Sequence, residues 1–215
     1  MFPGAWPVWN ASNGYADPDS ATYEIGGRCL KKYAVWLLLL PLLMGCSGTS
    51  KDLDAGINLR SKILQAAQCI LTLDITAEYN GRICGFTMDC TADRNGDLAF
   101  TVVEPDTISG ISGKLTGEEG QICFDNMTLQ FPLAAENLPS PICAPWILIN
   151  SLRCGFLSSS CVEEGKTRLS IDSRFSGDSL KLDVWLDEAN LPAHADILSD
   201  GCRILSMDVT KFQIS

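Results

Sequence analysis

The chain has 215 residues and a mass of 23.3 kDa, a length that suits one domain, or one domain with a targeting segment. Hydrophobic residues make up 46% and charged residues 20% of the chain, which is typical of a folded protein and not of a disordered one. The net charge of −10 argues against a phosphate-binding surface, and therefore against nucleic acid as the partner. His194 is the single histidine, which excludes a His-rich metal site. Most acid–base catalytic sites use histidine, so the sequence offers little for such a site.

Residues 30–45 have the organisation of a secretory signal peptide. Lys31 and Lys32 form a short basic segment, and the apolar run 33–44 follows it. Signal peptides carry an apolar segment of about 7–15 residues and a small residue before the cleavage site. A membrane-spanning helix needs about 20 apolar residues, so this run is too short to cross a bilayer.

The end of this segment, Leu43-Met44-Gly45-Cys46, is similar to a bacterial lipobox, although Met44 stands where Ala, Ser or Thr is more usual. The resemblance implies that Cys46 is acylated and becomes the mature N-terminus, with residues 46–51 as a flexible tether. We therefore expect a protein that is lipid-anchored on the extracytoplasmic face of a bacterial cell membrane. An ordinary signal peptide with a chance cysteine is the alternative.

Residues 1–29 contain Pro, Gly, Asn and Trp without any sustained period. Signal peptides rarely follow so long a leader, so we interpret these residues as an upstream extension, with translation beginning near Leu30. A genuine N-terminal extension is the alternative. In either case we expect the folded domain within residues 52–215.

The folded part is predicted to begin with a helix and to continue with strands. Helical spacing over residues 52–68 places four residues on one stripe, namely Leu53, Ile57, Arg60 and Leu64. From Leu71 to Tyr79 apolar and polar residues alternate, and Asn80-Gly81 is a strong hairpin signal. Two further alternating segments, 84–90 and 98–102, complete an antiparallel meander that is apolar on one face.

The second half of the chain is predicted to hold short strands around one helix. Between Pro141 and Leu157 the apolar residues have helical spacing, at Trp146, Ile149, Leu152 and Phe156. Strands are predicted on both sides of this helix, at 108–115, 122–125, 128–131, 169–171, 180–186, 193–198 and 203–212. Asp200-Gly201 predicts a second hairpin turn between the last two of them.

About ten strands and two helices predict a mainly β (α+β) fold, a single curved antiparallel sheet that forms a half-barrel covered by the helices. One face of the sheet is expected to meet water, because it carries Asp74, Glu78, Asp89, Lys181, Asp183 and Asp187. The other face is aliphatic and aromatic, and two helices cover only part of it. It must enclose a core, a ligand, or both.

The lipobox, the N-terminal helix, the meander and the stretch from Glu104 to Leu115 together resemble the LolA/LolB-like lipoprotein-carrier superfamily. The chain is also similar to small uncharacterised bacterial lipoproteins with a V-x-E-P-x-x-I-x-G-I-x-G stretch, here Val102 to Gly113, and an A-P-W helix, here Ala144-Pro145-Trp146. The resemblance covers residues 52–213. It implies a half-barrel that holds acyl chains or lipidated polypeptides in its concave face under a helical lid. The lipid anchor departs from the soluble carrier, which puts shuttling between two membranes in doubt.

Motifs of catalysis are missing from the sequence, so we expect no enzymatic activity and no cofactor. Gly110-Ile111-Ser112-Gly113 falls one residue short of a nucleophile elbow, and His194 is interpreted as a surface residue. Eight cysteines remain after Cys29 and Cys46 are set aside, an even number in a compartment that permits oxidation. Free buried thiols, one or more disulfides, and a metal site are all left open.

The sequence therefore predicts a membrane-anchored, non-enzymatic lipoprotein that binds an apolar ligand, an acyl chain or a lipidated polypeptide, in the concave face of the sheet. The candidate lining residues lie on the predicted meander and the covering helix: Leu73, Ile75, Phe86, Met88, Phe100, Val102, Trp146 and Ile149. The same side chains could instead form a closed core. In that case the alternative function is a protein-interaction or sensory envelope lipoprotein without a small-molecule ligand.

Overall fold

The computed structural model describes residues 50–79, 82–117, 119–135, 138–175 and 178–215. The predicted signal peptide, Cys46 and the Asn80-Gly81 turn lie outside the described residues. None of the helices in the described ranges is both long and apolar enough to cross a membrane.

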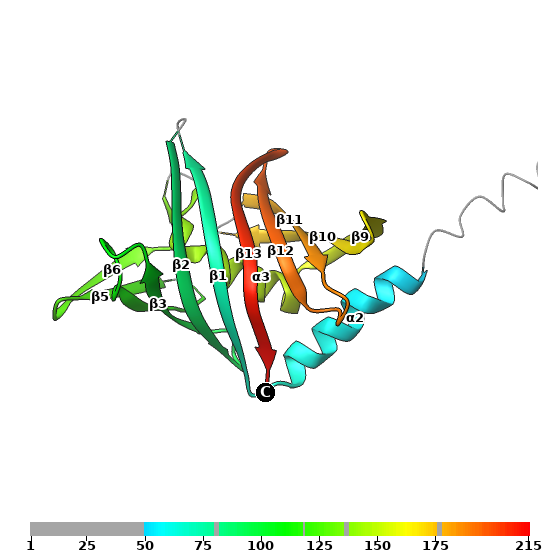
Figure 1. The fold of residues 1–215 in the computed structure, drawn as a ribbon, viewed down its shortest axis with the longest axis horizontal. Helices are drawn as coiled ribbons and strands as arrows, with labels where there is room; N and C mark the ends of the chain where they lie inside the picture. The colour runs from blue at the N-terminus through cyan, green and yellow to red at the C-terminus, as the bar shows by residue number, and fades with distance from the viewer. Residues whose placement is uncertain (1–49, 80–81, 118, 136–137, 176–177) are drawn as a thin grey trace, which may run out of the picture. The chain divides into compact units, whose positions relative to one another are not determined.

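The domain is built on one curved antiparallel sheet of 11 strands in the order β6-β5-β4-β3-β2-β1-β13-β12-β11-β10-β9 (Figure 1). Its strands are β1 (Gln68–Tyr79), β2 (Arg82–Asp93), β3 (Leu98–Glu104), β4 (Ser112–Leu115), β5 (Glu119–Phe124), β6 (Met127–Pro132), β9 (Phe156–Glu163), β10 (Lys166–Phe175), β11 (Asp178–Leu186), β12 (Pro192–Ser199) and β13 (Cys202–Ile214). A separate pair joins β7 (Ala134–Ala135) to β8 (Leu138–Pro139). The predicted half-barrel class and the β1-β2-β3 meander are confirmed.

The last strand, β13, closes the middle of the sheet by pairing with β1. The predicted Asp200-Gly201 turn before it is present, and both residues have positive φ, 50° and 78°. Two such residues are the requirement of the tight turns that join antiparallel strands. The C-terminal strand therefore connects the first half of the sheet, β1–β6, to the second half, β9–β12.

Strand β9 was not predicted, and the predicted helix was too long at its C-terminal end. Helix α3 spans Ala144–Cys154, and Phe156 already belongs to β9. The helix stops because Gly155 is extended, with φ −65° and ψ 155°. A Cβ on Gly155 would lie 2.4 Å from Cγ2 of Ile171, so only glycine lets the chain pass so close to β10. The serines of β9 give no alternation of apolar and polar residues, as is common on an edge strand.

Helix α2 (Ser50–Gln65) confirms the predicted N-terminal helix, but a different stripe is buried. Leu59 and Ile63 are each 1% exposed, whereas Ile57 is 53% and Leu64 is 47% exposed. Arg60, from the predicted stripe, faces α3. Its Nε donates a hydrogen bond to the Leu152 carbonyl oxygen at 2.7 Å, and its Nη2 donates one to the Gly155 carbonyl oxygen at 2.6 Å.

The core lies between the two helices and the face of the sheet that carries Leu71, Leu73 and Ile75, which we call the inner face. Side chains of the other strands that share this face are also buried, among them Met88, Cys90, Leu98, Phe100, Leu182, Val184, Ile197, Leu205 and Met207. Helix α3 contributes Ile147, Leu148, Ile149 and Leu152 to the same core. The opposite face, the outer face, carries the predicted polar residues.

Candidate functional site

Most of the predicted lining residues form a closed core. Leu73, Met88 and Ile149 are 0% exposed, Ile75 is 1% exposed, and Phe100 and Val102 are 3% exposed. Within the described part of the chain, four of the eight candidates border a cavity, and Phe100 does so beside outer-face residues such as Thr72 and Asp89. Phe86 and Val102 lie together in one cavity, and Trp146 lies in another.

The first cavity, which we call the hairpin cavity, has a volume of about 220 Å³. Its lining is almost entirely apolar: Phe86, Val102, Ile108, Ile111, Ile122, Ser140, Pro141 and Ile142. These residues come from the inner face of β2, β3 and β5, from the β3–β4 connection and from the short 3₁₀ helix η1 (Pro141–Cys143). The lining contains no ionisable side chain, so this cavity favours an apolar ligand group.

The sequence prediction missed five apolar members of this cavity. Ile108 and Ile111 were noted only as parts of a motif, and Ile122 could have been found from strand alternation. Pro141 and Ile142 carry no periodic signal, because η1 is too short to show one. They line the cavity because η1, which directly precedes α3, passes beside it.

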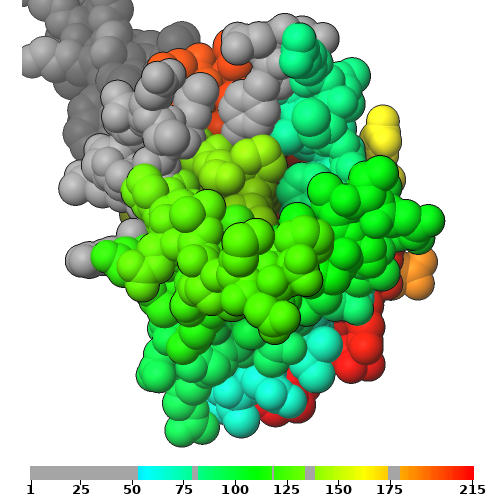
Figure 2. All heavy atoms as spheres, turned by 90° about the vertical axis from the view of Figure 1, so that its left-hand side faces the viewer, coloured from blue at the N-terminus to red at the C-terminus, as the bar shows by residue number. Residues whose placement is uncertain are grey.

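The β5–β6 hairpin extends the apolar surface beyond the cavity. Residues paired across the sheet share a face, and one row runs Phe100, Gly113, Ile122 and Leu129. The inner face of the hairpin therefore carries Leu129, 64% exposed, and the next pair outward, Phe124 and Met127, which are 49% and 68% exposed. Figure 2 looks onto this side of the domain, with atoms of the β3–β6 region, in green, at the front.

Gly113 has a structural role at the base of this surface. A Cβ on Gly113 would lie 2.6 Å from Cζ of Phe100 and 2.1 Å from the Gln121 carbonyl oxygen. The Phe100 ring therefore lies over the glycine backbone, where any larger residue would displace it. The Gly110-Ile111-Ser112-Gly113 segment, which falls one residue short of a nucleophile elbow, therefore has a packing role in this structure.

The second cavity, which we call the helix-end cavity, lies between α3 and the start of β9. Its volume is about 370 Å³, and it is lined by Trp146, Ile147, Asn150, Cys154, Gly155, Phe156, Asp172 and Ser173. This lining is more polar than that of the hairpin cavity. Trp146 therefore does not share a cavity with Phe86, contrary to what a single concave pocket would require.

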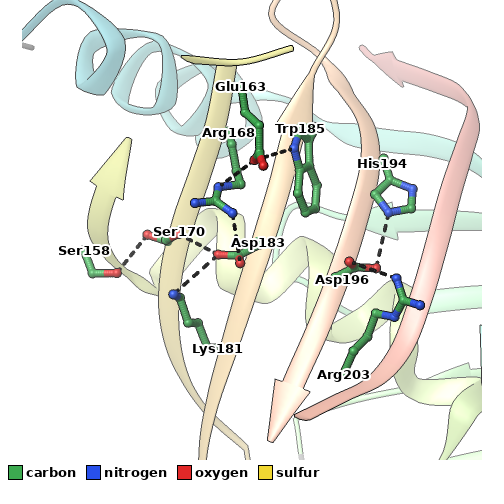
Figure 3. A network of polar contacts seen from close by, with 10 residues as sticks. All are labelled: Ser158, Glu163, Arg168, Ser170, Lys181, Asp183, Trp185, His194, Asp196 and Arg203. Carbon is green, nitrogen blue, oxygen red and sulfur yellow. Dashed lines mark hydrogen bonds and ion pairs between the residues drawn. The ribbon is translucent and has the colours of Figure 1, made fainter. Parts of the chain in front are cut away.

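The outer face carries a network of polar contacts on β9–β13 (Figure 3). Asp183, predicted to face water, is only 7% exposed. Its carboxylate accepts a hydrogen bond of 2.5 Å from the Ser170 hydroxyl, and it lies 4.0 Å from Arg168 Nη1 and 3.9 Å from Lys181 Nζ. The long side chains around it exclude water, which is why a carboxylate on the outer face becomes buried. Asp74, Glu78, Asp89 and Lys181 are exposed as predicted.

His194 on β12 is half-buried and bridges two carboxylates. Its Nδ1 lies 2.7 Å from Asp208 Oδ1, and its Nε2 lies 3.2 Å from Asp196 Oδ1. Hydrogen bonding to Asp196 raises the pKa of His194, burial works against this rise, and Asp208 adds to it. Arg203 Nη1 lies 3.5 Å from Asp196 Oδ2, so its positive charge offsets the negative charge of the Asp196 carboxylate. The arrangement favours the charged imidazole, because both ring nitrogens face carboxylate oxygens.

The eight cysteines of the described residues form no disulfide. Burial raises the pKa of the Cys143 thiol to about 12, and burial also raises the pKa of Cys90. Both thiols therefore stay protonated and act as small apolar side chains. Within the described ranges, no group of three or more His, Cys, Asp or Glu residues is placed to hold a metal ion.

No protein-family model matches the chain, and no curated protein matches it significantly. Among solved structures, a LolA superfamily protein from Nitrosomonas europaea is 8% identical, with a TM-score of 0.42 over 74% of this chain and 93% of its own. A putative outer membrane lipoprotein-sorting protein domain from Vibrio parahaemolyticus is 10% identical, with a TM-score of 0.43 over 76% of this chain and 92% of its own. The lipoprotein LppX from Mycobacterium tuberculosis is 10% identical, with a TM-score of 0.37 over 76% of this chain and 96% of its own.

The expected resemblance to the LolA-like lipoprotein-carrier fold is therefore found among solved structures. At these TM-scores, 0.37 to 0.43, the resemblance carries no role, ligand or partner over to this chain.

Proposed function

We propose that this protein is a lipid-anchored envelope lipoprotein whose inner sheet face binds an apolar ligand group, an acyl chain or a lipidated polypeptide. The observation that carries the proposal is the continuous apolar surface formed by the hairpin cavity and the inner face of the β5–β6 hairpin. The proposed role is binding and not catalysis, because this surface offers apolar contact and no ionisable side chain.

The size of the cavity limits what it holds. Sites for drug-sized ligands usually measure about 300–1,000 Å³, whereas the hairpin cavity measures about 220 Å³. It would therefore take one end of an apolar chain, and the remainder would lie along Ile122, Leu129 and Phe124. Burying such exposed apolar surface is favourable by about 25 cal/mol per Å².

A second candidate function is favoured by the filled core. Because Leu73, Ile75 and Met88 are buried at the centre of the sheet, the exposed hairpin side chains could be the whole binding surface. A protein-interaction or sensory lipoprotein would use them to bind another envelope polypeptide. Both functions use the same hairpin, and they differ in whether the hairpin cavity is entered.

The test uses a fluorescent fatty acid and the purified full chain. Leu129→Ser should weaken binding of the probe, because it places a hydroxyl on the inner face of β6. Ile83→Ser is the matched control: Ile83 is 73% exposed, but strand alternation places it on the outer face of β2. Weakened binding in Leu129→Ser alone supports the ligand site. Absence of probe binding to the unchanged chain contradicts it and favours the protein-binding alternative.

A further inference from the structure

Strand β6 forms one edge of the 11-stranded sheet, and no other strand in the described ranges pairs with its free side. Its residues from Met127 to Gln130 are all exposed, and the β5–β6 hairpin projects from the left-hand end of the domain in Figure 1. An edge strand presents unpaired backbone N–H and C=O groups. These groups favour pairing with another strand unless charge, proline or a bulge prevents it.

The opposite edge of the sheet, β9, carries two such protections. Ser158 has no partner residue on β10, because the register shifts there and leaves a bulge. The strand also ends in Glu163, which is followed by Glu164. Strand β6 has no charged side chain, its pairing with β5 has no register shift, and its one proline, Pro132, is its last residue. Of the two edges, β6 is therefore the one suited to pairing.

The turn of the hairpin fixes which backbone groups of β6 are free. Both residues of the Asp125-Asn126 turn have positive φ, 46° and 62°, as in a two-residue type I′ turn. Phe124 and Met127 close this turn as a hydrogen-bonded pair, and hydrogen-bonded and non-hydrogen-bonded pairs alternate from there. The N–H and C=O groups of Thr128 and Gln130 therefore point away from β5.

These free groups complement a second copy of the same strand. When two β6 strands lie antiparallel with Leu129 at the two-fold axis, Thr128 of each copy lies opposite Gln130 of the other, and their backbone groups can form four hydrogen bonds. The inner faces of both copies then lie on the same side of the extended sheet. There Leu129 meets its own counterpart, and Met127 of each copy meets Phe131 of the other.

The distribution of charge also favours this edge for contact between copies. The chain has a net charge of −10, so most of its surface repels a second copy. Between Gly120 and Pro132 the sequence has one charged residue, Asp125, which lies in the turn beyond the paired residues. Two β6 strands therefore meet without opposing carboxylates.

We propose that β6 pairs with β6 of a second copy and forms a two-fold symmetric dimer with one sheet continuous across both chains. Leu129, which is 64% exposed, and Met127, which is 68% exposed, become covered at this interface. Each copy has one β6 edge, so association ends at two chains. The pairing needs no ligand and goes beyond the proposed function.

Sedimentation equilibrium of the purified full chain should show a concentration-dependent change from one chain to two. Gln130→Pro should weaken this association by about tenfold or more, because it removes one N–H from each copy and so two of the four backbone hydrogen bonds. This N–H is not used in pairing with β5, and proline is tolerated at such edge positions, so the hairpin should stay folded. Gln130→Thr keeps the N–H and is the matched control, with association within about twofold of the unchanged chain.

Cysteine cross-linking tests the register without a proline variant. Leu129→Cys should form a disulfide between copies in oxidised glutathione, because residues of a non-hydrogen-bonded pair have Cα atoms about 4.5 Å apart, which a disulfide can span. Met127→Cys is the matched control, since Met127 is similarly exposed but lies opposite Phe131 of the other copy and not opposite itself. The unchanged chain gives the baseline from its exposed native cysteines, and peptide mass spectrometry identifies the link at position 129.

A chain that stays monomeric at every concentration overturns the proposal. A Gln130→Pro chain that associates like the unchanged chain also overturns it, as does equal cross-linking of Leu129→Cys and Met127→Cys. These measurements contain no fatty acid, so they report the pairing alone. Absence of fatty-acid probe binding with the dimer retained would therefore count against the proposed function and not against the pairing of β6.

Discussion

At the residue scale, the one histidine of the chain shows how a surface position becomes a fixed ionic bridge. His194 lies between Asp208 on β13 and Asp196 on its own strand, with the edge of its ring against Trp185 at a centroid distance of 5.2 Å. Trp185 in turn donates to Glu163, which pairs with Arg168. The ring contact with Trp185 therefore places His194 beside the polar network on β9–β11. Figure 3 shows that network and the contact of His194 with Asp196.

We expect the contribution of His194 to stability to depend on pH. Its pKa is raised in the folded state, so its contribution is fully present below the unfolded value of about 6.5 and is lost as pH rises through the folded value. The difference in unfolding free energy between the unchanged chain and His194→Gln should be larger at about pH 5.5 than at about pH 9. We expect a change of about 1 kcal/mol or less, because the pair is partly exposed.

Urea denaturation at the two pH values measures this difference, and contributions from other titrating groups cancel in the comparison. The Asp196 pKa is affected first by burial, which raises it, but hydrogen bonds from His194 and Ser206 and the neighbouring charges lower it overall. Its contribution is lost only as pH falls below its unfolded value of about 4, outside the tested interval. A difference that does not vary with pH would contradict the bridge.

At the element scale, the side chain of Arg60 links helix α2 to the end of helix α3. Arg60 of α2 satisfies the Leu152 and Gly155 carbonyl oxygens at the C-terminal end of α3, where backbone carbonyls lack partners within the helix. Helix α2 lies close to the sheet at Gly56, where a Cβ would lie 3.0 Å from Leu157 Cδ2. The helix pair and the β9–β10 edge therefore form one packed unit.

Arg60→Ala should lower the free energy of unfolding by about 1–3 kcal/mol, because it removes charge-assisted hydrogen bonds and leaves buried carbonyl groups unpaired. Lys62→Ala is the matched control, since Lys62 lies on the exposed side of the same helix and should change stability by about 0.5 kcal/mol or less. Both values come from urea denaturation of the full chain. Equal effects of the two substitutions would mean that α2 is held by apolar packing alone.

At the scale of the whole molecule, the proposed anchor would hold the domain close to the bilayer. Only a few residues separate Cys46 from Ser50, where α2 begins, and an extended chain spans at most about 3.3–3.6 Å per residue. Two acyl chains bind a bilayer stably, whereas one chain binds only marginally. The anchor should therefore decide whether the protein stays with the membrane.

Expressed in a bacterial host, Cys46→Ser should leave the membrane fraction or accumulate unprocessed. Cys154→Ser, which changes an exposed cysteine within the domain, should remain membrane-bound and processed. Immunoblots of separated membrane and soluble fractions check both outcomes, and mass spectrometry locates the mature N-terminus. A correctly cleaved Cys46→Ser protein that stays on the membrane would rule out the lipid anchor.

Local signals in the sequence predicted most of the fold. Alternation over Leu71 to Tyr79 and the Asp200-Gly201 pair depend only on neighbouring residues, so the strands and turns followed from them. Strand β9 could not be predicted from local signals, because an edge strand rich in serine shows no alternation of apolar and polar residues. The buried stripe of α2 was also mispredicted, since Leu53 and Leu59 are equally apolar and only the contacts of α2 with α3, β9 and β10 distinguish them.

The sequence alone determined the strand-rich class, the apolar inner face and the absence of recognisable catalytic motifs, because hydrophobic period and residue type are properties of the chain itself. The tertiary structure decided which apolar side chains meet a cavity. Met88 and Phe86 are two residues apart on the same face of β2, yet Met88 is buried in the core and Phe86 lines the hairpin cavity. That difference depends on how far α3 and η1 extend across the sheet, and this arises from packing between segments distant in sequence.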